Sequence, residues 1–465
     1  MSGLRDECGV FGIYLSDRGR EVSRIIYYGL YALQHRGQES AGIASSDGAR
    51  LRYFKDMGLV SEVFDSKILT QLKGYAGIGH VRYSTTGSSY VANAQPLVVR
   101  YKGGEIALAH NGNLINASAL RDQLEMQGAV FQTTSDTEVI ANLIARAEKN
   151  DIEDAMAWAL SNIKGSYAVV MLTPDSVIGV RDPYGIRPLC LGQLEGGYVL
   201  ASESCALDAI GAEFIRDIEP GEGVTINNNG VQSFTIAKSP KKALCSFEFV
   251  YLARTDSVID GASVYRARIN AGRLLAMEHP VQADMVIGVP DSGTTAAIGY
   301  AQQSGIPFGE GLIKNRYVGR TFIQPEQRKR EEGVKVKLNA LRETVKGKRI
   351  VMIDDSIVRG TTSRQIVDML RDAGASEVHM RISSPPVQYP CYFGIDTPSR
   401  EHLIGATHTV KEISEIIGAD SLAYLSLDGL VRSIAETTNN DEFDAASNPY
   451  CLACFNGCYP VDVSF

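Results

Sequence analysis

A cysteine that could act as a nucleophile lies close to the start of the chain, in MSGLRDECGVFGIY. If the leader, residues 1–7, is removed as a propeptide, Cys8 gains a free α-amine beside its thiol. An amine with a pKa of about 8 can take the thiol proton, so the residue can serve as its own base. The alternative is a buried thiol in the core, in which case the stretch has no catalytic meaning.

Polar residues beside glycines, in LQHRGQESAGI, GHVRYSTTG, AHNGNL and TTSDTEV, offer partners for such a thiol. Arg82 could clamp a carboxylate and Asp136 could receive an ammonium, which together would recognise a free amino acid. Asn111 and the N–H of Gly112 could form an oxyanion hole. Three histidines lie in the same motifs: His35, His80 and His110. They leave a Cys–His pair as an alternative to the α-amine.

A second chemical signal is RIVMIDDSIVRGTTSRQ, which predicts a strand, a loop and a helix. Asp354 and Asp355 end the strand, and Gly360 with three hydroxyl residues begins the helix. A helix amino end with small residues favours a phosphate. Adjacent carboxylates would repel that phosphate unless they bind ribose hydroxyls or Mg²⁺. The loop therefore predicts a phosphorylated sugar ligand, whereas the simpler alternative is a helix capped by Asp and Ser/Thr.

The surrounding sequence agrees with a sugar phosphate more than with a nucleotide cofactor. No G-x-G-x-x-G follows a predicted strand, and no Walker motif occurs. The basic stretch KNRYVGRTFIQPEQRKREEGVKVK contains Gly319 and Pro325, which break a helix. We interpret it as a lid that closes over a diphosphate, the alternative being a solvated charged surface.

Cysteines near the end of the chain form a third group, in PYCLACFNGCYP. Cys451 and Cys454 have C-x-x-C spacing, and Cys245 and Cys391 could complete a four-thiolate site. Spacing alone leaves redox, zinc, iron–sulfur and accidental interpretations open. The other three cysteines are predicted to be structural: Cys190, Cys205 and Cys458.

The elements that would position these groups differ between the two halves. Up to about residue 240, short strands alternate with turns, and helices are predicted over 23–37 and 136–151, which favours stacked antiparallel sheets. The segments 283–305 and 348–383 each predict a buried strand, a loop and a helix, as in a parallel sheet. With a linker at AKSPKK, the predicted domains are 8–240 and 241–465.

Composition limits the classes of function. The chain has 465 residues, 44% of them hydrophobic and 22% charged, which is ordinary for a globular enzyme. A net charge of −8 argues against a nucleic-acid binder. No apolar run approaches the roughly 18 residues of a membrane helix, and no secretory signal is recognisable. A cytoplasmic enzyme without a membrane partner is expected.

The motifs of the first half resemble class II glutamine amidotransferases, and DDSIVRGTTS with VPDSG resembles type I phosphoribosyltransferases. Together they resemble the glutamine phosphoribosylpyrophosphate amidotransferase family, in its iron–sulfur, propeptide-containing branch. The resemblance implies an α+β N-terminal-nucleophile glutaminase joined to an α/β phosphoribosyltransferase domain. It also implies transfer of ammonia from glutamine to 5-phosphoribosyl 1-diphosphate (PRPP). The products would be 5-phosphoribosylamine, glutamate and diphosphate, in the first step of purine biosynthesis.

The same resemblance assigns roles to residues. It makes Cys8 the nucleophile, with Asn111 and Gly112 as the oxyanion hole. Glutamine would be bound by Arg36, Arg82, Thr85 and Asp136. PRPP would be bound by Asp291, Ser292, Gly293, Lys314, Tyr317, Asp354, Asp355, Ser356, Arg359, Gly360, Thr361, Thr362 and Ser363. Mg²⁺ would be held by Ser292, Asp354 and Asp355, and a 4Fe-4S cluster by Cys245, Cys391, Cys451 and Cys454.

Partners follow from the same family. Purine nucleotides are expected to inhibit, and a homo-oligomer, a dimer or a tetramer, is expected. A non-catalytic regulator that senses purines or PRPP is the alternative function, but it would not require Cys8, Arg82 and Asp136. An asparagine or glutamate synthase would not require the DDSIVRGTTS loop.

Overall fold

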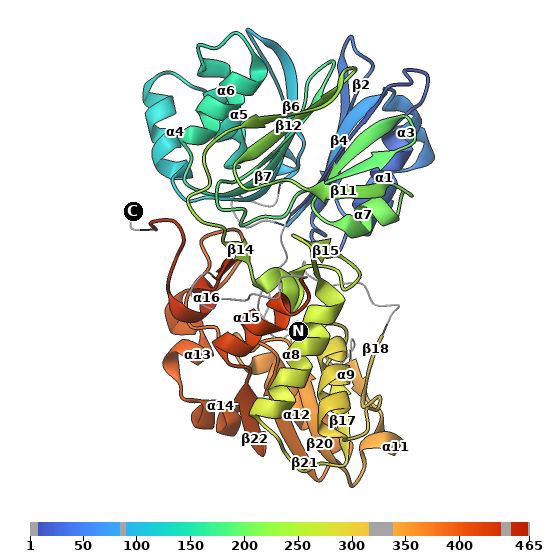
Figure 1. Ribbon diagram of the computed structural model, residues 1–465, viewed down its shortest axis with the longest axis vertical. Helices are drawn as coiled ribbons and strands as arrows, with labels where there is room; N and C mark the ends of the chain where they lie inside the picture. The colour runs from blue at the N-terminus through green and yellow to red at the C-terminus, as the bar shows by residue number, and fades with distance from the viewer. Residues whose placement is uncertain (1–7, 84–89, 316–337, 439–447, 464–465) are drawn as a thin grey trace.

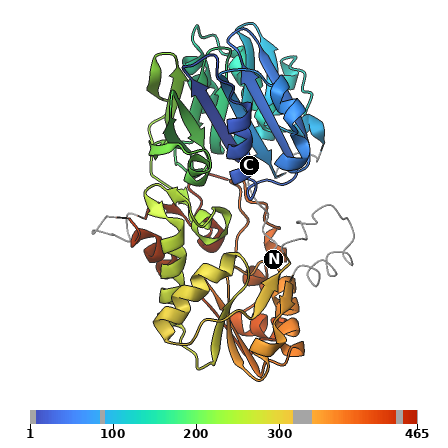
Figure 2. The ribbon, with the colours of Figure 1, turned by 90° about the vertical axis from the view of Figure 1, so that its right-hand side faces the viewer.

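The computed structural model describes residues 8–83, 90–315, 338–438 and 448–463. The described chain forms two lobes, the first half of the sequence in one and most of the second half in the other (Figures 1 and 2). The leader, Thr85, Tyr317 and most of the proposed lid lie outside the described residues.

Two antiparallel sheets stack in the first lobe. This arrangement agrees with the short strands and turns predicted from the sequence. In spatial order, the seven-stranded sheet consists of β11 (Glu213–Asp217), β9 (Cys190–Leu194), β10 (Gly197–Ala201), β1 (Gly9–Leu15), β4 (Ala76–Arg82), β2 (Ser40–Ser46) and β3 (Leu51–Met57). The six-stranded sheet consists of β13 (Gly230–Thr235), β12 (Glu222–Asn227), β8 (Val177–Arg181), β7 (Gly165–Leu172), β6 (Gly104–Leu114) and β5 (Leu97–Tyr101).

Small residues let the two sheets approach closely. A Cβ on Gly12 of β1 would lie 2.8 Å from a methyl group of Val170 on β7. Alternate residues of the inner strands, such as Val10 and Ala109, are fully buried between the sheets. This packing fixes β1 and β6, which carry two of the expected catalytic segments, against one another.

Helices cover the outer faces of both sheets. They are α1 (Ser23–Ala32), α2 (Val60–Val63), α3 (Ser66–Gln71) and α7 (Ser204–Asp208) on the first sheet, and α4 (Ala117–Met126), α5 (Thr137–Arg146) and α6 (Ile152–Ser161) on the second. Both helices predicted from the sequence are present but shorter. The first ends at Ala32, before a turn that carries Arg36, and the second ends at Arg146, ahead of the cap of α6 at Asp151.

A four-stranded parallel sheet lies in the second lobe, in the order β17 (Met285–Gly288), β20 (Arg349–Asp354), β21 (Glu377–Ile382) and β22 (Ser421–Tyr424). One face packs against α8 (Val264–Glu278), α9 (Ser292–Ser304) and α15 (Leu427–Ala435), and the other against α12 (Thr361–Asp372) and α14 (Val410–Ile417). Figure 2 shows yellow and orange helices on opposite sides of this sheet. The predicted α/β class is confirmed.

Shorter elements complete the described chain. They are η1 (Val91–Asn93), η2 (Glu248–Leu252), η3 (Arg400–His402), α11 (Arg342–Val345), α13 (Ile404–Thr407), α16 (Ala453–Asn456), β14 (Leu244–Cys245), β15 (Val258–Ile259), β16 (Ala262–Ser263), β18 (Leu312–Lys314), β19 (Leu338–Ala340) and β23 (Tyr450–Cys451). The pairing of β14 with β23 ties the tail to the start of the second half. Within the described ranges, no helix has the length and apolarity needed to cross a bilayer.

Candidate active sites

Cys8 immediately precedes β1 and is buried, with 8% of its surface exposed. Its Sγ atom lies 3.5 Å from the carbonyl oxygen of Tyr83, the residue after β4. Gly9 pairs with Val81 of β4, and a Cβ on Gly9 would lie 2.9 Å from a methyl group of Val81. The thiol therefore sits at the end of the sheet where β4 delivers Arg82.

Asn111 lies on β6 and is fully buried. Neither its amide nitrogen nor its amide oxygen has a hydrogen-bond partner in the described part of the chain. The next residue, Gly112, has φ of +144°, and a Cβ there would lie 2.1 Å from the carbonyl oxygen of Ser166. Only glycine fits this position. A buried amide without a partner can donate to an oxygen that gains negative charge during a reaction.

Asp136 immediately precedes α5 and is buried near the end of β6. One carboxylate oxygen accepts from the N–H of Leu114 at 3.1 Å, and the other lies 3.6 Å from Nδ1 of His110. Burial favours the neutral acid, but the His110 ring and the backbone N–H groups outweigh it and hold the pKa of Asp136 below its usual value. The residue therefore keeps a negative charge that could meet an ammonium group.

The remaining histidines of these motifs have other partners. His35 Nε2 lies 2.6 Å from a carboxylate oxygen of Glu203. His80 is fully buried, its Nε2 lies 3.0 Å from the carbonyl oxygen of His110, and burial lowers its pKa to about 3. These contacts give His35 and His80 partners other than the Cys8 thiol.

Two arginines were expected to bind glutamine. In the structure, both form ion pairs with carboxylates of the protein itself. Arg82 Nη1 donates to Glu39 at 2.6 Å. Arg36 is almost fully buried, donates through Nε to Glu203, and donates through Nη2 to Glu248 at 2.5 Å. The guanidinium of Arg36 is thus committed to two buried carboxylates, which suits a supporting role better than direct contact with glutamine.

The PRPP motifs converge at the carboxyl ends of β17 and β20. Asp354 ends β20, and Ser292 begins α9 just after β17. The Ser292 hydroxyl donates to Asp355, and the Ser356 hydroxyl donates to the same carboxylate at 2.5 Å. A Cβ on Gly293 would lie 2.4 Å from the carbonyl oxygen of Ile353, so glycine allows this close approach.

Two adjacent buried carboxylates are costly without a cation. Burial, and then the charge of Asp355, raises the pKa of Asp354 to about 8. Burial also raises the pKa of Asp355, although hydrogen bonds from Ser292 and Ser356 and the charge of Arg268 oppose it. A divalent cation or a pair of ribose hydroxyls would remove this penalty, so the donor set fits Mg²⁺ or a sugar.

The other predicted PRPP residues that the structure describes lie on nearby loops and at the start of α12. Gly360 has φ of +76° and caps α12, which begins with Thr361, Thr362 and Ser363. Arg359 is exposed beside this cap. Lys314, at the end of β18, forms an ion pair with Asp291 in the loop after β17. A helix amino end and two basic side chains therefore adjoin the buried acidic pair.

Four cysteines from three separate parts of the sequence meet where the tail returns to the second half. Cys245 pairs in register with Cys451 across β14 and β23. Burial raises the pKa of Cys454, and the nearby thiols of Cys245, Cys391 and Cys451 raise it further. Among the described residues, no three His, Cys, Asp or Glu side chains form a group that could hold a metal ion. A 4Fe-4S cluster on these four cysteines therefore stays a prediction from the sequence.

The remaining cysteines are in ordinary surroundings. Cys190 and Cys205 are buried in an apolar cluster, and burial raises both thiol pKa values. Cys458 is exposed. The structural role of these three cysteines stays a prediction from the sequence.

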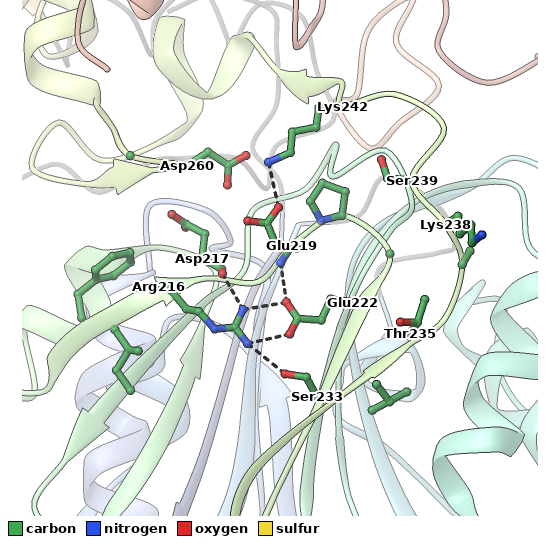
Figure 3. Close-up of a pocket in the computed structure, with 17 residues that line it drawn as sticks. Arg216, Asp217, Glu219, Glu222, Ser233, Thr235, Lys238, Ser239, Lys242 and Asp260 are labelled. Atoms are coloured by element: carbon green, nitrogen blue, oxygen red, sulfur yellow. Dashed lines mark hydrogen bonds and ion pairs between the residues drawn. The ribbon is translucent and has the colours of Figure 1, made fainter. Parts of the chain in front are cut away.

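A separate surface hollow of about 760 Å³ lies between β11, β13 and the hairpin of β15 and β16 (Figure 3). Four of its charged side chains form two ion pairs. Arg216 binds Glu222 at 2.7 Å, and Lys242 binds Glu219 at 2.9 Å. No described residue among those expected to bind glutamine or PRPP lines it, so we assign no reaction to this hollow.

Sequence reasoning missed three groups that the structure places beside the expected glutaminase residues: Glu39, Glu203 and Glu248. Glu39 lies within LQHRGQESAGI, so this motif could have indicated it as a site residue. Glu203 and Glu248 are far from Arg36 in sequence, and no local pattern indicates their pairing.

Comparisons with known proteins agree with both halves. A family model described as a glutamine amidotransferase domain matches residues 80–209, and one described as a phosphoribosyl transferase domain matches residues 268–383. The amidophosphoribosyltransferase of Archaeoglobus fulgidus is 57% identical over 98% of each chain. That of Bacillus subtilis is 52% identical, over 100% of this chain and 96% of the relative.

Solved structures show the same arrangement. The glutamine PRPP amidotransferase of B. subtilis, in complex with ADP and GMP, superimposes with a TM-score of 0.91 at 51% identity, covering 98% of each chain. A structure described as the allosteric regulatory enzyme of purine biosynthesis gives the same TM-score at 52% identity, covering 98% of this chain and 97% of that one. From its two domains to its full-length relatives, the chain belongs to the amidophosphoribosyltransferase family.

Proposed function

We propose that the chain transfers ammonia from glutamine to PRPP and releases 5-phosphoribosylamine, glutamate and diphosphate, as the first step of purine biosynthesis. The observation that carries this proposal is the relation to amidophosphoribosyltransferases over nearly the whole of both chains. The buried acidic pair supports it independently, and so does the buried amide of Asn111, which has no hydrogen-bond partner within the described ranges.

In the glutaminase half, the Cys8 thiolate attacks the γ-carboxamide of glutamine. Asn111 and the Gly112 N–H stabilise the negative oxygen of the tetrahedral intermediate. Ammonia leaves as the γ-glutamyl thioester forms, and water then releases glutamate and restores the thiol. Arg82, Thr85 and Asp136 hold the two charged ends of glutamine, with Asp136 receiving the ammonium. Arg36 supports the segment around Cys8.

In the phosphoribosyltransferase half, ammonia attacks C1 of the ribose and displaces diphosphate. The helix amino end at Gly360 to Ser363 binds the 5-phosphate, and Asp354 with Asp355 meets the ribose hydroxyls. Positive charge around the phosphates comes from Lys314 and Arg359, and Tyr317 contacts them. The diphosphate is bound by residues 291–293. Mg²⁺ would be held by Ser292, Asp354 and Asp355 together with the diphosphate and would neutralise its charge.

Two further features belong to the same proposal. Removal of residues 1–7 gives Cys8 the α-amine that acts as its base. Cys245, Cys391, Cys451 and Cys454 hold a 4Fe-4S cluster, whose role is structural because neither half-reaction transfers electrons. The gathering of these four thiols supports the cluster. Closing loops this long in the unfolded chain would stabilise the fold.

Regulation, location and assembly complete the proposal. The solved B. subtilis enzyme contains ADP and GMP. A nucleoside monophosphate shares the ribose 5-phosphate of PRPP, so purine nucleotides are proposed as inhibitors at the PRPP site. A cytoplasmic location and a dimer or tetramer stay predictions from the sequence.

The test of this function is product stoichiometry. The purified chain, supplied with glutamine, PRPP and Mg²⁺, should release glutamate and diphosphate in equal amounts. Ammonia should replace glutamine as the nitrogen donor. Glutamate release without diphosphate release would contradict the proposal, and so would PRPP binding without turnover, which is expected of a non-catalytic sensor.

A further inference from the structure

Glu248 is a fully buried carboxylate of the second half that reaches into the first half. Its carboxylate lies beside two arginines, Arg36 and Arg187. We propose that Glu248 is a positioning residue for the glutaminase site, where it fixes the supports of both the nucleophile and the oxyanion hole. The inference rests on the proposed roles of Cys8, Asn111 and Gly112.

Arg36 connects Glu248 to the nucleophile. Its Nη2 donates to Glu248 at 2.5 Å, and its Nη1 lies 3.4 Å from the other carboxylate oxygen. The side chain then passes close to Gly9, since a Cβ on Gly9 would lie 3.5 Å from Cδ of Arg36. The carboxylate therefore fixes the side chain against which the residue after Cys8 packs.

Arg187 connects Glu248 to the oxyanion strand. Its Nη1 lies 3.6 Å from Glu248, and its Nε donates to the carbonyl oxygen of Phe393 at 2.9 Å. The Ser166 hydroxyl donates to the same oxygen at 2.7 Å, and Ser166 is the residue whose carbonyl constrains Gly112. The carbonyl of Phe393 is thus shared between an arginine tied to Glu248 and the strand paired with Gly112.

Gly394 brings the second half into direct contact with Gly112. A Cβ on Gly394 would lie 3.4 Å from Cα of Gly112 and 3.1 Å from Nη2 of Arg187. The neighbouring side chain, Asn113, donates to the carbonyl oxygen of Tyr392 at 2.9 Å. A loop of the second half therefore packs beneath the proposed oxyanion hole.

The segment that carries Glu248 is also fixed from the PRPP side. Glu248 begins η2, and Arg268 of α8 donates to the carbonyl oxygens of Phe249 and Ala253, each at 2.8 Å. Arg268 is itself close enough to Asp355 to act on its charge. One short segment therefore contacts the supports of both proposed sites.

The proposed role of Glu248 depends on its charge more than on its packing. A buried carboxylate beside two guanidinium groups satisfies charges that the surrounding protein cannot solvate. Glutamine has nearly the same shape but is neutral and turns one acceptor into a donor. Glu248→Gln should therefore move Arg36 and Arg187 while leaving the apolar packing of η2 intact.

The experiment measures glutamine hydrolysis and ammonia-dependent synthesis with the same preparations. Glu248→Gln should lower kcat for glutamine by about 10- to 100-fold, because a misplacement near 1 Å can cost that much. Its KM for glutamine and its ammonia-dependent rate should change by less than about threefold. Iodoacetamide should alkylate Cys8 at an altered rate.

Asp260→Asn is the matched control, because it removes another ion pair between the halves, the one with Arg181. It should change neither glutamine hydrolysis nor ammonia-dependent synthesis by more than about twofold.

A less disruptive variant tests the same inference if Glu248→Gln folds poorly. Ser166→Ala removes only the hydroxyl on the Phe393 carbonyl and should lower kcat for glutamine several-fold without changing ammonia use. Thr225→Ala removes a comparable hydroxyl elsewhere in the same sheet and should not. Normal glutamine kcat in either Glu248→Gln or Ser166→Ala would overturn the inference. Glutamine hydrolysis by Cys8→Ser would instead refute the proposed function on which it rests.

Discussion

The hydroxyl of Ser292 donates a hydrogen bond to the carboxylate of Asp355, although the two residues are 63 positions apart. Ser292 begins α9 after β17, and Asp355 follows the neighbouring strand β20. Because both strands are parallel, their carboxyl ends open at the same edge of the sheet. The bond therefore joins the two loops assigned to the diphosphate and to the ribose into one site.

Asp354→Asn and Asp355→Asn should each weaken PRPP binding in both the glutamine and the ammonia assays. Loss of one charged hydrogen-bonding group should raise the KM for PRPP by about 10- to 100-fold. Asp284→Asn is the control, because this carboxylate pairs with Arg349 at the opposite end of the same strands and should leave KM unchanged. A mutant of the acidic pair that lost only glutamine hydrolysis would contradict the assignment.

Burial of His80 should make the protein less stable in acid. The imidazole is neutral in the folded protein because its pKa is lowered to about 3, whereas an unfolded chain binds a proton near pH 6.5. Its stabilising contribution is therefore present above pH 6.5 and is lost as pH falls toward 3. Near pH 5, His80→Gln should reduce the slope of unfolding free energy against pH by about 1.4 kcal/mol per unit. This slope can be measured by urea unfolding at several pH values.

The exposed residue His402 provides the comparison, because His402→Gln should leave that slope unchanged. An equal slope in wild type and His80→Gln would show that the imidazole is not held neutral. A normal acid limb of glutaminase activity in a folded His80 variant would agree with the α-amine as the base.

Cys451→Ser should give poorly folded, protease-sensitive protein with less bound iron, because it removes one proposed cluster ligand and one link between the tail and β14. Cys458→Ser, in the same tail but exposed, should keep full iron content and protease resistance. Iron, zinc and sulfide are measured after anaerobic purification, with limited proteolysis of both variants. Zinc without iron in the wild type would contradict the cluster.

Local sequence patterns predicted much of this molecule. The periods of apolar residues indicated antiparallel strands in one half and buried parallel strands in the other, and the structure confirms both classes. The loops at Asp354 and Val289 were placed correctly at strand ends because strand, loop and helix are contiguous in the sequence. Helix ends were less accurate, as residues 33–36 continue the helical pattern but form a turn that carries Arg36.

Pairings between distant segments could not be predicted in the same way. Arg36 suited a carboxylate ligand by its chemistry, but its partners Glu203 and Glu248 come from other elements and are visible only in the fold. Gly394 likewise has no local signal that it packs against Gly112. Such contacts depend on how the two lobes meet, which neither composition nor periodicity specifies.

The most direct test of the account is the nitrogen source used by Cys8→Ser. We predict that this variant makes no 5-phosphoribosylamine from glutamine and makes it from ammonia at a rate within about twofold of the wild type. N-terminal sequencing of the active wild type should find Cys8 as the first residue. Normal synthesis from glutamine by Cys8→Ser would contradict the claim that one chain joins a cysteine glutaminase to a separate PRPP site.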